Sequence, residues 1–229
     1  MLPSNIAGLV VWLRADLDRY TTSTGDTAAN TSTDPVGRWE DQTSGARHFV
    51  QATDAARPTY LSTIPSINFD GSNDVLSYAG SRTDTSGTLI LAFKTGATAF
   101  ATRGSQVLFS SADTGTANNW FEVGITSEGR LYIDYNASGT QHTIVGHKFL
   151  SLSTAYHLGI AFDDTDFYVH INGVEQNPLM ITSVGTFGWL GDVSGADNLS
   201  VGGTVTSAGL VRPFLGDILE VALYSRDIT

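Results

Sequence analysis

The sequence contains no cysteine, and this absence removes several kinds of chemistry. Disulfide bridges, thiolate nucleophiles, zinc–thiolate sites and iron–sulfur clusters all need the cysteine sulfur. No run approaches the roughly 18 apolar residues of a membrane-spanning helix. The first residues, Met1–Asn5, lack the charged and apolar regions of a secretory signal peptide. That start is expected of a domain taken from a longer chain, or of a protein, such as a virion component, that leaves its cell without secretion.

Basic residues are also scarce. The chain has 12 Lys and Arg against 23 Asp and Glu, which gives a net charge of −11. Nucleic acids and anionic membrane surfaces are bound by neutralising phosphates with cationic side chains, so this charge disfavours both. We therefore expect no nucleic-acid partner and no membrane insertion. Uncharged ligands, cations such as Ca²⁺ and protein partners remain possible.

A helical pattern is missing as well, because no segment longer than about ten residues carries an apolar stripe of 3.6-residue period. Charged residues make up only 15% of the chain, and there are 24 Gly and 6 Pro. Short β-rich runs separated by polar turns predict an all-β protein. The predicted strands are Leu9–Arg14, Ser66–Phe69, Val75–Tyr78, Thr88–Phe93, Gln106–Ser110, Trp120–Ile125, Arg130–Tyr135, Thr143–Val145, His157–Phe162, Phe167–Ile171, Leu199–Val201 and Asp217–Tyr224.

Two dipeptides predict tight hairpins, since Asn and Gly accept the positive φ of such turns. They are Asn172-Gly173 and Glu128-Gly129, and the second would join Trp120–Ile125 to Arg130–Tyr135 in an antiparallel meander. The polar stretch Thr21–Asp34 predicts a long surface loop. No linker or internal repeat divides the chain, so we expect a single domain over residues 1–229.

Several longer motifs occur in a fixed order along the chain. They are Ala7–Asp16, Val36–Gly45, Ala56–Tyr60, Ile67–Leu76, Tyr156–Asp164, Phe167–Val174, Asp197–Gly203 and Pro213–Tyr224. Together they resemble the laminin G-like modules of bacteria and phages, within the concanavalin A-like lectin/glucanase superfamily. The resemblance covers nearly the whole chain and implies a two-sheet antiparallel jelly-roll sandwich. The same fold hosts many functions, so the resemblance predicts structure better than activity.

The alternation of apolar residues along the strands predicts a core. We expect the following side chains to be mostly buried: Trp12, Phe69, Leu91, Phe93, Ile133, Ile160, Phe162, Val169, Ile171, Val201, Ile218 and Val221. Trp39, like Trp12, is interpreted as a core residue rather than a sugar platform, because it lies beside an apolar run.

No catalytic constellation matches the known jelly-roll enzymes. Laminarinase-like glycosidases place three carboxylates along one strand as Glu-x-Asp-x-x-Glu, whereas Glu122 is the only acid on its strand. Glu122 and Asp134 could meet across a hairpin, for which a structural role is the favoured interpretation. Asp217 and Glu220 would point to opposite faces of a strand. Alginate-lyase-like jelly rolls use a His and Tyr pair. The chain has His and Tyr residues, but the strand motifs of those lyases are missing from its sequence. We therefore expect no catalytic residues.

The resemblance also implies a metal site, because sandwiches of this superfamily often hold one structural Ca²⁺ beside the last long strand. Asp217 is the position that would carry it, with Asp70 and Asp74 as weaker partners. The alternative is that Asp217 only pairs with a backbone amide at the start of its strand.

For a glycan, an exposed aromatic ring beside Asn or Asp is the expected recognition element. Two segments provide it: Asn119-Trp120, and Trp189 followed by Asp192. Trp189 lies in a Gly-rich segment interpreted as a loop, so a surface role is as plausible as a core one. For Trp120, which begins a strand, a core position is favoured.

These features support a non-catalytic recognition or adhesion module that binds a glycan or a surface partner. The alternative is a structural or decoration protein of a phage or virus particle, oligomeric within a larger assembly. A polysaccharide-active enzyme ranks third. The expected location is extracellular, at a cell surface, or in a virion.

Overall fold

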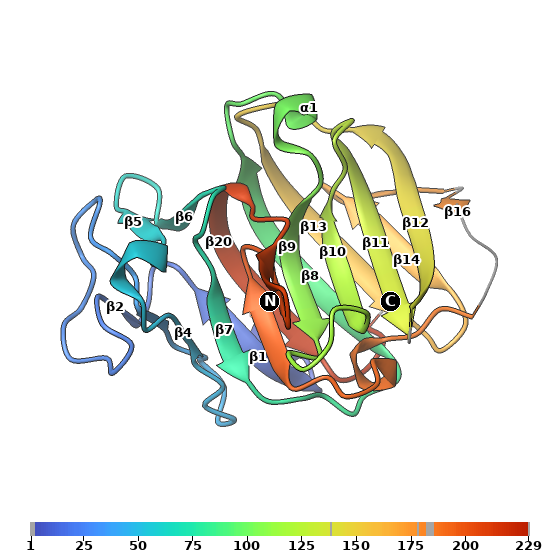
Figure 1. Cartoon of the computed structure of the whole chain (residues 1–229), viewed down its shortest axis with the longest axis horizontal. Coiled ribbons are helices and arrows are strands. Elements are labelled where there is room, and N and C mark those ends of the chain that lie inside the picture. The colour runs from blue at the N-terminus through green and yellow to red at the C-terminus, as the bar shows by residue number, and fades with distance from the viewer. Residues whose placement is uncertain (1–2, 138, 178, 182–185, 229) are drawn as a thin grey trace.

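The chain folds into two antiparallel β-sheets, as seen in a computed structural model that describes residues 3–137, 139–177, 179–181 and 186–228 (Figure 1). Strands account for 47% of the structure and helices for 6%, which confirms the expected jelly-roll sandwich with very little helix. The helical elements are short, and no helix within the described ranges has the length and apolar character needed to span a bilayer. They are η1 (Pro3–Asn5), η2 (Asp54–Ala56), α1 (Phe100–Arg103) and η3 (Leu190–Asp192).

The first sheet, here called sheet A, brings together strands from both ends of the chain. In spatial order it contains β15 (Val174–Glu175), β14 (Phe167–Ile171), β13 (Ala155–Phe162), β8 (Gly87–Thr95), β20 (Leu215–Tyr224), β6 (Ser66–Asp70) and β5 (Thr59–Leu61), while β1 (Leu9–Arg14) also pairs with β20.

The second sheet, sheet B, contains the meander β9–β12 next to its edge strand β16. In spatial order it contains β16 (Met180–Ile181), β12 (Thr140–Phe149), β11 (Arg130–Ala137), β10 (Trp120–Ile125), β9 (Gln106–Ala112), β17 (Asn198–Val201), β7 (Leu76–Ala79), β4 (Phe49–Val50), β3 (Arg38–Trp39) and β2 (Arg19–Tyr20). A separate two-stranded hairpin, β18 (Thr204–Thr206) and β19 (Gly209–Val211), connects β17 to β20.

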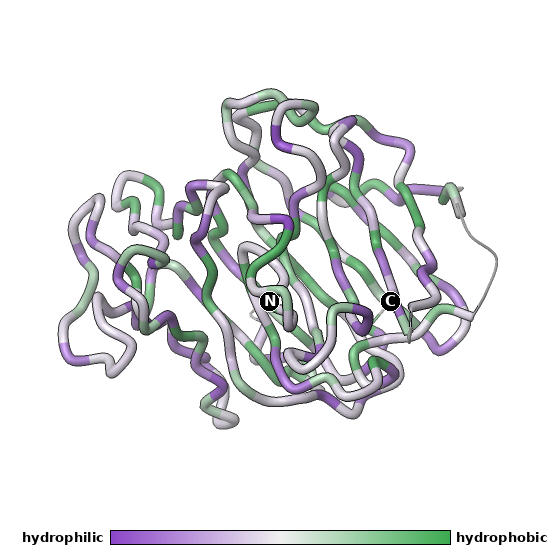
Figure 2. The backbone as a smooth tube through the Cα atoms, viewed as in Figure 1, coloured by the Kyte–Doolittle hydropathy of each residue, from purple (hydrophilic) through white to green (hydrophobic). Residues whose placement is uncertain are grey.

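The core lies between the two sheets, as the period-two pattern predicts. Along the strands, hydrophobic and hydrophilic residues alternate (Figure 2), and the inward residues of β10 are Phe121, Val123 and Ile125. All twelve predicted core residues are buried. Trp39 is fully buried in the main core, and its indole Nε1 donates to the Arg14 carbonyl oxygen at 2.8 Å. Trp12 is buried in a different place, a small cluster with Ala222 and Tyr224 outside the main core.

Both predicted hairpin turns are present. Asn172 and Gly173 have φ values of +53° and +75° and join β14 to β15. Gly129, with φ of +82°, ends the turn between β10 and β11. This second turn fixes the register in which Glu122 lies directly opposite Asp134.

Candidate functional site

The outer face of sheet B carries polar side chains, because the residues that alternate with the inward apolar ones point away from the core. On β10 and β11 these are Trp120 and Glu122, then Tyr132 and Asp134. Thr143 of β12 is directly opposite Asp134. Carboxylates, hydroxyls and aromatic rings from three adjacent strands are thereby gathered into one patch.

Glu122 is the buried centre of this patch, with none of its surface exposed. Its Oε1 accepts hydrogen bonds from Thr204 Oγ1 at 2.6 Å and from Arg212 Nη2 at 2.7 Å, and its Oε2 accepts one from the Tyr132 hydroxyl at 3.3 Å. Thr204 begins the β18–β19 hairpin, which lies over this part of sheet B. The residue before it, Gly203, accepts a hydrogen bond from Ser110 Oγ of β9 at its carbonyl oxygen. The hairpin therefore seals Glu122 from solvent.

Burial raises the pKa of the Glu122 carboxyl, and the charge of Arg212 opposes that rise. Burial beside the Glu122 carboxylate also raises the pKa of the Tyr132 hydroxyl well above its ordinary value. Tyr132 therefore stays a neutral hydrogen-bond donor, and its hydroxyl donates to Glu122. The Glu122 carboxylate is therefore held by one ion pair, with Arg212, and by the neutral hydroxyl donors of Thr204 and Tyr132.

Arg212 forms the side wall of the patch. Its φ of +52° turns the chain just after β19 and brings the guanidinium back to Glu122. The guanidinium also lies 5.0 Å from the centroid of the Trp120 ring, within the range of a cation–π contact. Two bonds to one carboxylate and one aromatic neighbour fix this side chain, although 31% of it remains exposed.

Asp134 is the second carboxylate of the patch and is 3% exposed. Its Oδ2 accepts from Gln141 Nε2 at 2.6 Å and from the Trp120 indole at 3.3 Å, and its Oδ1 accepts from Thr143 Oγ1 at 2.9 Å. All of these donors are neutral. Asp134 is thus a fixed acceptor whose charge no ion pair among the described residues balances.

A cavity of about 140 Å³ opens above these groups. We call it the sheet B groove, and it is lined by Ser105, Thr126, Tyr132, Asp134, Gln141, Thr143 and Arg212. It offers hydroxyl, amide, guanidinium and carboxylate groups held in place by their mutual hydrogen bonds, with the half-buried Trp120 beside them. Such a set can bind a polyhydroxylated molecule that has an apolar face.

The same geometry argues against acid–base chemistry at Glu122. Glu122 and Asp134 do meet across the hairpin, as the sequence allowed. A general acid or base must reach the proton it transfers, at hydrogen-bond distance in a plausible substrate pose. Glu122 has no exposed surface, and its oxygens accept bonds from Thr204, Tyr132 and Arg212. Its role in this structure is to hold Arg212.

Of the four predicted ligand-binding residues, only Trp120 lies beside the groove. Trp189 is 1% exposed, so of the two roles left open for it the core role holds, and its candidacy as an exposed ligand-binding ring is wrong. Its ring packs at 5.0 Å from Phe121 and at 6.3 Å from both Phe162 and Phe167. Because of this packing, the Gly-rich segment around it is folded into the core and does not form an open loop.

The two predicted polar ligands have structural contacts of their own. Asn119 is 9% exposed, and its amide donates to the Ser194 carbonyl oxygen at 2.9 Å. Asp192 is exposed, and its Oδ2 accepts the Trp189 backbone N–H at 2.8 Å, which caps η3. Asp192 also borders a separate opening with Tyr135, His142 and Phe187. The predicted pairs Asn119-Trp120 and Trp189-Asp192 therefore do not form one site.

The three predicted metal ligands do not converge either. Asp217 Oδ1 accepts from Asn68 Nδ2 at 2.6 Å, and its Oδ2 lies 3.9 Å from the Lys94 amine. Asp70 Oδ1 accepts the backbone N–H groups of Ser72 and Asn73, as expected of a sharp turn. Among the described residues no group of three or more acidic or His side chains could hold a metal ion.

An ammonium beside Asp217 and backbone donors on the other two carboxylates are unfavourable to a hard cation, which needs six to eight oxygens. The donor set therefore does not fit a calcium site shared by Asp217, Asp70 and Asp74. A structural Ca²⁺ stays a prediction from the resemblance alone.

The buried carboxyl of Asp74 makes the stability of the fold depend on pH. Burial raises its pKa from 3.8 to about 6, against the favourable bond from the Asp70 backbone N–H and with a further rise from the Asp70 charge. A carboxyl whose pKa is higher in the folded state stabilises the fold below its unfolded pKa, and this contribution is lost as the pH rises through the folded pKa.

We expect the Asp74→Asn variant to lose this dependence, because the amide oxygen still accepts the Asp70 N–H without a charge. Relative to the variant, the wild type should lose on the order of 2 kcal/mol of unfolding free energy between about pH 4 and about pH 7. Urea unfolding of both proteins across that range is the measurement. A constant difference between them would show that Asp74 titrates normally.

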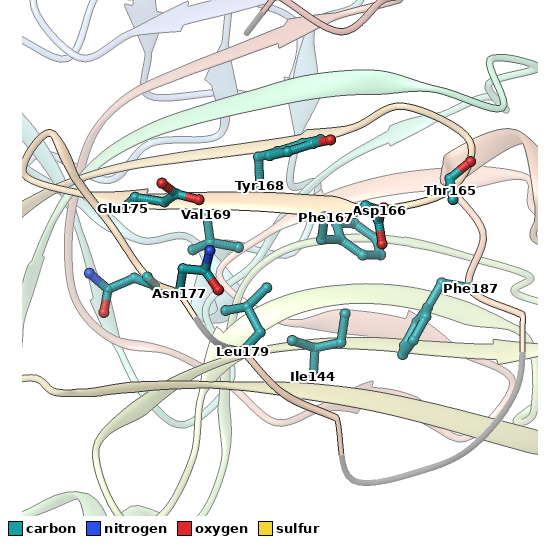
Figure 3. A pocket seen from close by; sticks show the side chains of 11 residues that line it. Ile144, Thr165, Asp166, Phe167, Tyr168, Val169, Glu175, Asn177, Leu179 and Phe187 are labelled. Carbon is teal, nitrogen blue, oxygen red and sulfur yellow. The ribbon is translucent and has the colours of Figure 1, made fainter.

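A further opening lies between the sheets, at the edge formed by β12 and β14 (Figure 3). The side chains of Ile144, Val169, Leu179 and Phe187 point toward one another there, around a volume of about 290 Å³. It leads toward the apolar core, and its polar side chains do not form a hydrogen-bonded set like that of the sheet B groove. We assign it no ligand.

Comparison with known proteins agrees with this architecture. The sequence profile of the concanavalin A-like lectin/glucanases superfamily matches residues 69–229, which is more than half of the chain. The chain belongs to this superfamily. The comparison with curated proteins finds no significant match for this superfamily member.

Several solved structures share the superfamily fold. The CBM40 module of the Ruminococcus gnavus IT-sialidase, bound to α2,3-sialyllactose, has a TM-score of 0.54 and 18% identity over 63% of this chain and 78% of that one. A leech intramolecular trans-sialidase has a TM-score of 0.52 and 23% identity over 64% of this chain and 22% of that one. The Trypanosoma rangeli sialidase has a TM-score of 0.61 and 14% identity over 100% of this chain and 33% of that one. At these identities the likeness shows a shared fold.

Proposed function

We propose that this chain is a non-catalytic glycan-binding module whose binding site is the sheet B groove. The observation that carries the proposal is the arrangement of Trp120, Arg212 and Asp134, which are fixed to one another beside an open cavity. Sugars present hydroxyl groups around a ring that has an apolar face. An aromatic ring next to rigid donors and acceptors recognises both features.

Preorganisation supports the same conclusion. Binding is weakened when side chains must be ordered on contact with the ligand. In this groove Arg212 is held by Glu122, and Asp134 is held by Gln141 and Thr143, before any ligand arrives. A carbohydrate would meet groups that already have their bound positions.

The charges of the groove favour a neutral sugar. Arg212 is paired with Glu122, while Asp134 adds a carboxylate that only neutral donors contact. An anionic sugar would meet this carboxylate within a chain of net charge −11. We therefore expect discrimination against sialylated glycans, although the CBM40 module that shares this fold is bound to sialyllactose.

The sealed position of Glu122 and the hydrogen bonds that Asp134 accepts support a non-catalytic role. The expected setting is a cell surface or another extracellular location where glycans are displayed. The alternative of a phage or virus structural component uses the same fold, and the test below separates the two, because a purely structural protein needs no glycan affinity.

The experiment is a glycan array of neutral and sialylated sugars, followed by calorimetry on the best ligand. We expect neutral glycans to bind and Trp120→Ala to weaken binding by about 2 kcal/mol, roughly 30-fold, as for an aromatic anchor. The unfolding midpoint should change little, because Trp120 is only half-buried.

Tyr168→Ala is the matched control, since it removes a half-buried aromatic residue from β14 of the other sheet. Equal affinity of the Trp120→Ala variant and the wild type would exclude the groove as the site. A protein that binds no sugar on the array would contradict the proposed function.

A further inference from the structure

An exposed aromatic residue lies further along the same face of sheet B. Phe149, at the end of β12, is 58% exposed and is opposite Arg130 of β11. The Arg130 guanidinium lies 4.2 Å from the centroid of the Phe149 ring. Arg130 Nη1 also donates to the sulfur of Met180, which is 39% exposed and is opposite Val145 of β12. We call Arg130, Phe149 and Met180 the second platform.

The second platform is on the same face as the groove, because Arg130, Tyr132 and Asp134 are two residues apart along β11. The two features are also joined through Thr126, which lines the groove. Its Oγ1 accepts the backbone N–H of Arg130 at 3.2 Å, and its own N–H donates to the Arg130 carbonyl oxygen at 2.8 Å. Thr126 therefore connects the wall of the groove to the strand end that carries Arg130.

The spacing of the two aromatic residues follows from the sheet register. Trp120 is opposite Asn136, and Arg130 lies six residues from Asn136 along β11. At about 3.3 Å per residue, the two ends of the face are roughly 20 Å apart along the strand. A single sugar unit at Trp120 cannot reach Phe149 over that distance, whereas a linear chain of sugars can.

The charges of the second platform match those of the groove. Arg130 Nε lies 3.6 Å from Glu128 Oε2, just as Arg212 is paired with Glu122. Each of these two arginines thus has its own carboxylate partner, and neither is left to neutralise an anionic ligand. The whole face therefore suits an uncharged polymer.

We propose that this face binds a linear neutral oligosaccharide along β11, with Trp120 and Phe149 contacting sugar units at opposite ends. This inference rests on the proposed function. The ring of Phe149, held by Arg130, stacks on the apolar face of a sugar. The groove between them bonds the hydroxyls of the intervening units. Affinity then depends on the length of the glycan and not only on its terminal sugar.

The test is calorimetry of the full chain with cello-, laminari-, xylo- and manno-oligosaccharides, each from disaccharide to hexasaccharide. In the series that binds, affinity should rise at least about tenfold with length, the gain expected of one additional aromatic contact. Phe149→Ala should remove this gain and leave the affinity for the disaccharide unchanged. Trp120→Ala should weaken binding at every length.

Ile64→Ala is the matched control, because it removes a 63%-exposed apolar side chain beside sheet A. Met180→Ala, the second variant, should reduce the length dependence in part. Affinity that is independent of length, or a Phe149→Ala variant that keeps the full gain, overturns the inference while the proposed function survives. Absence of binding throughout all four series and the array overturns both.

Discussion

Replacing Arg212 with alanine is expected to lower the free energy of unfolding by about 3–5 kcal/mol near neutral pH, the range for breaking a buried ion pair. The variant leaves Glu122 with no exposed surface and no opposite charge. Thr204 and Tyr132 still donate to it, but neutral donors compensate only part of the cost of a buried carboxylate. The same variant should also lose the glycan affinity that we propose for the groove.

The loss should depend on pH in a definite direction. Without Arg212, only the hydrogen bond from Thr204 opposes the rise that burial, together with the Asp134 charge, imposes on the pKa of Glu122. The folded variant then gains stability from protonation at low pH, and this gain disappears as the pH rises through the folded pKa. The difference between wild type and Arg212→Ala is therefore small at acidic pH and large at alkaline pH.

Urea unfolding at several pH values measures this effect, and the double variant Glu122→Gln with Arg212→Ala completes the cycle. The double variant should recover part of the loss, because it removes the buried charge together with its partner. Arg14→Ala is the comparison for an exposed pair, since Arg14 and Asp16 are partly solvated, and it should cost less than about 1 kcal/mol. If Arg212→Ala also cost less than about 1 kcal/mol of unfolding free energy, Glu122 would have to be neutral in the wild type.

Replacing Trp189 with alanine is the second large effect, with an expected loss of about 3–5 kcal/mol from the cavity it creates. The indole is 1% exposed and is surrounded by Phe121, Phe162 and Phe167. It also packs so closely on Gly87 that a side chain at that position would overlap the indole. The surrounding strands belong to both sheets, so the site cannot collapse easily.

Chemical unfolding monitored by circular dichroism measures this loss of unfolding free energy. Trp120→Ala provides the contrast, because the same substitution at the half-buried tryptophan should change binding and leave stability nearly intact. A loss below about 1 kcal/mol for Trp189→Ala would place its indole in solvent and restore its candidacy as a sugar platform.

The fold could be predicted because its signals are local. The alternation in Phe121, Val123 and Ile125 defines the inward face of β10, and the Glu128-Gly129 turn then determines which residues of β11 are opposite it. The opposition of Glu122 and Asp134 follows from that same turn. The sequence thus provided the cross-hairpin pair of Asp134, which lines the groove, and Glu122, which is sealed beside it.

The rest of the site depends on contacts between distant segments. Arg212 follows Glu122 by 90 positions and reaches it through a turn with φ of +52°, for which an Arg gives no sequence signal. The sequence left the position of Trp189 undecided between surface and core for a related reason. Its Gly-rich neighbours are typical of a loop, but Asp192 caps η3 and directs the indole inward. Asp217 likewise pairs with Asn68, 149 positions away, which no local pattern indicates.

The β18–β19 hairpin gives the superfamily fold a part that can evolve separately. Among the strands that the structure describes, its two strands pair only with each other, and the hairpin connects β17 of one sheet to β20 of the other without entering either ladder. Insertions or replacements in this hairpin can reshape the wall of the groove while the core packing stays unchanged. One constraint accompanies that freedom: a new hairpin that brings no cation near position 212 requires a neutral residue in place of Glu122. In this chain an exchange of the hairpin therefore has to be matched by a change at position 122 of β10.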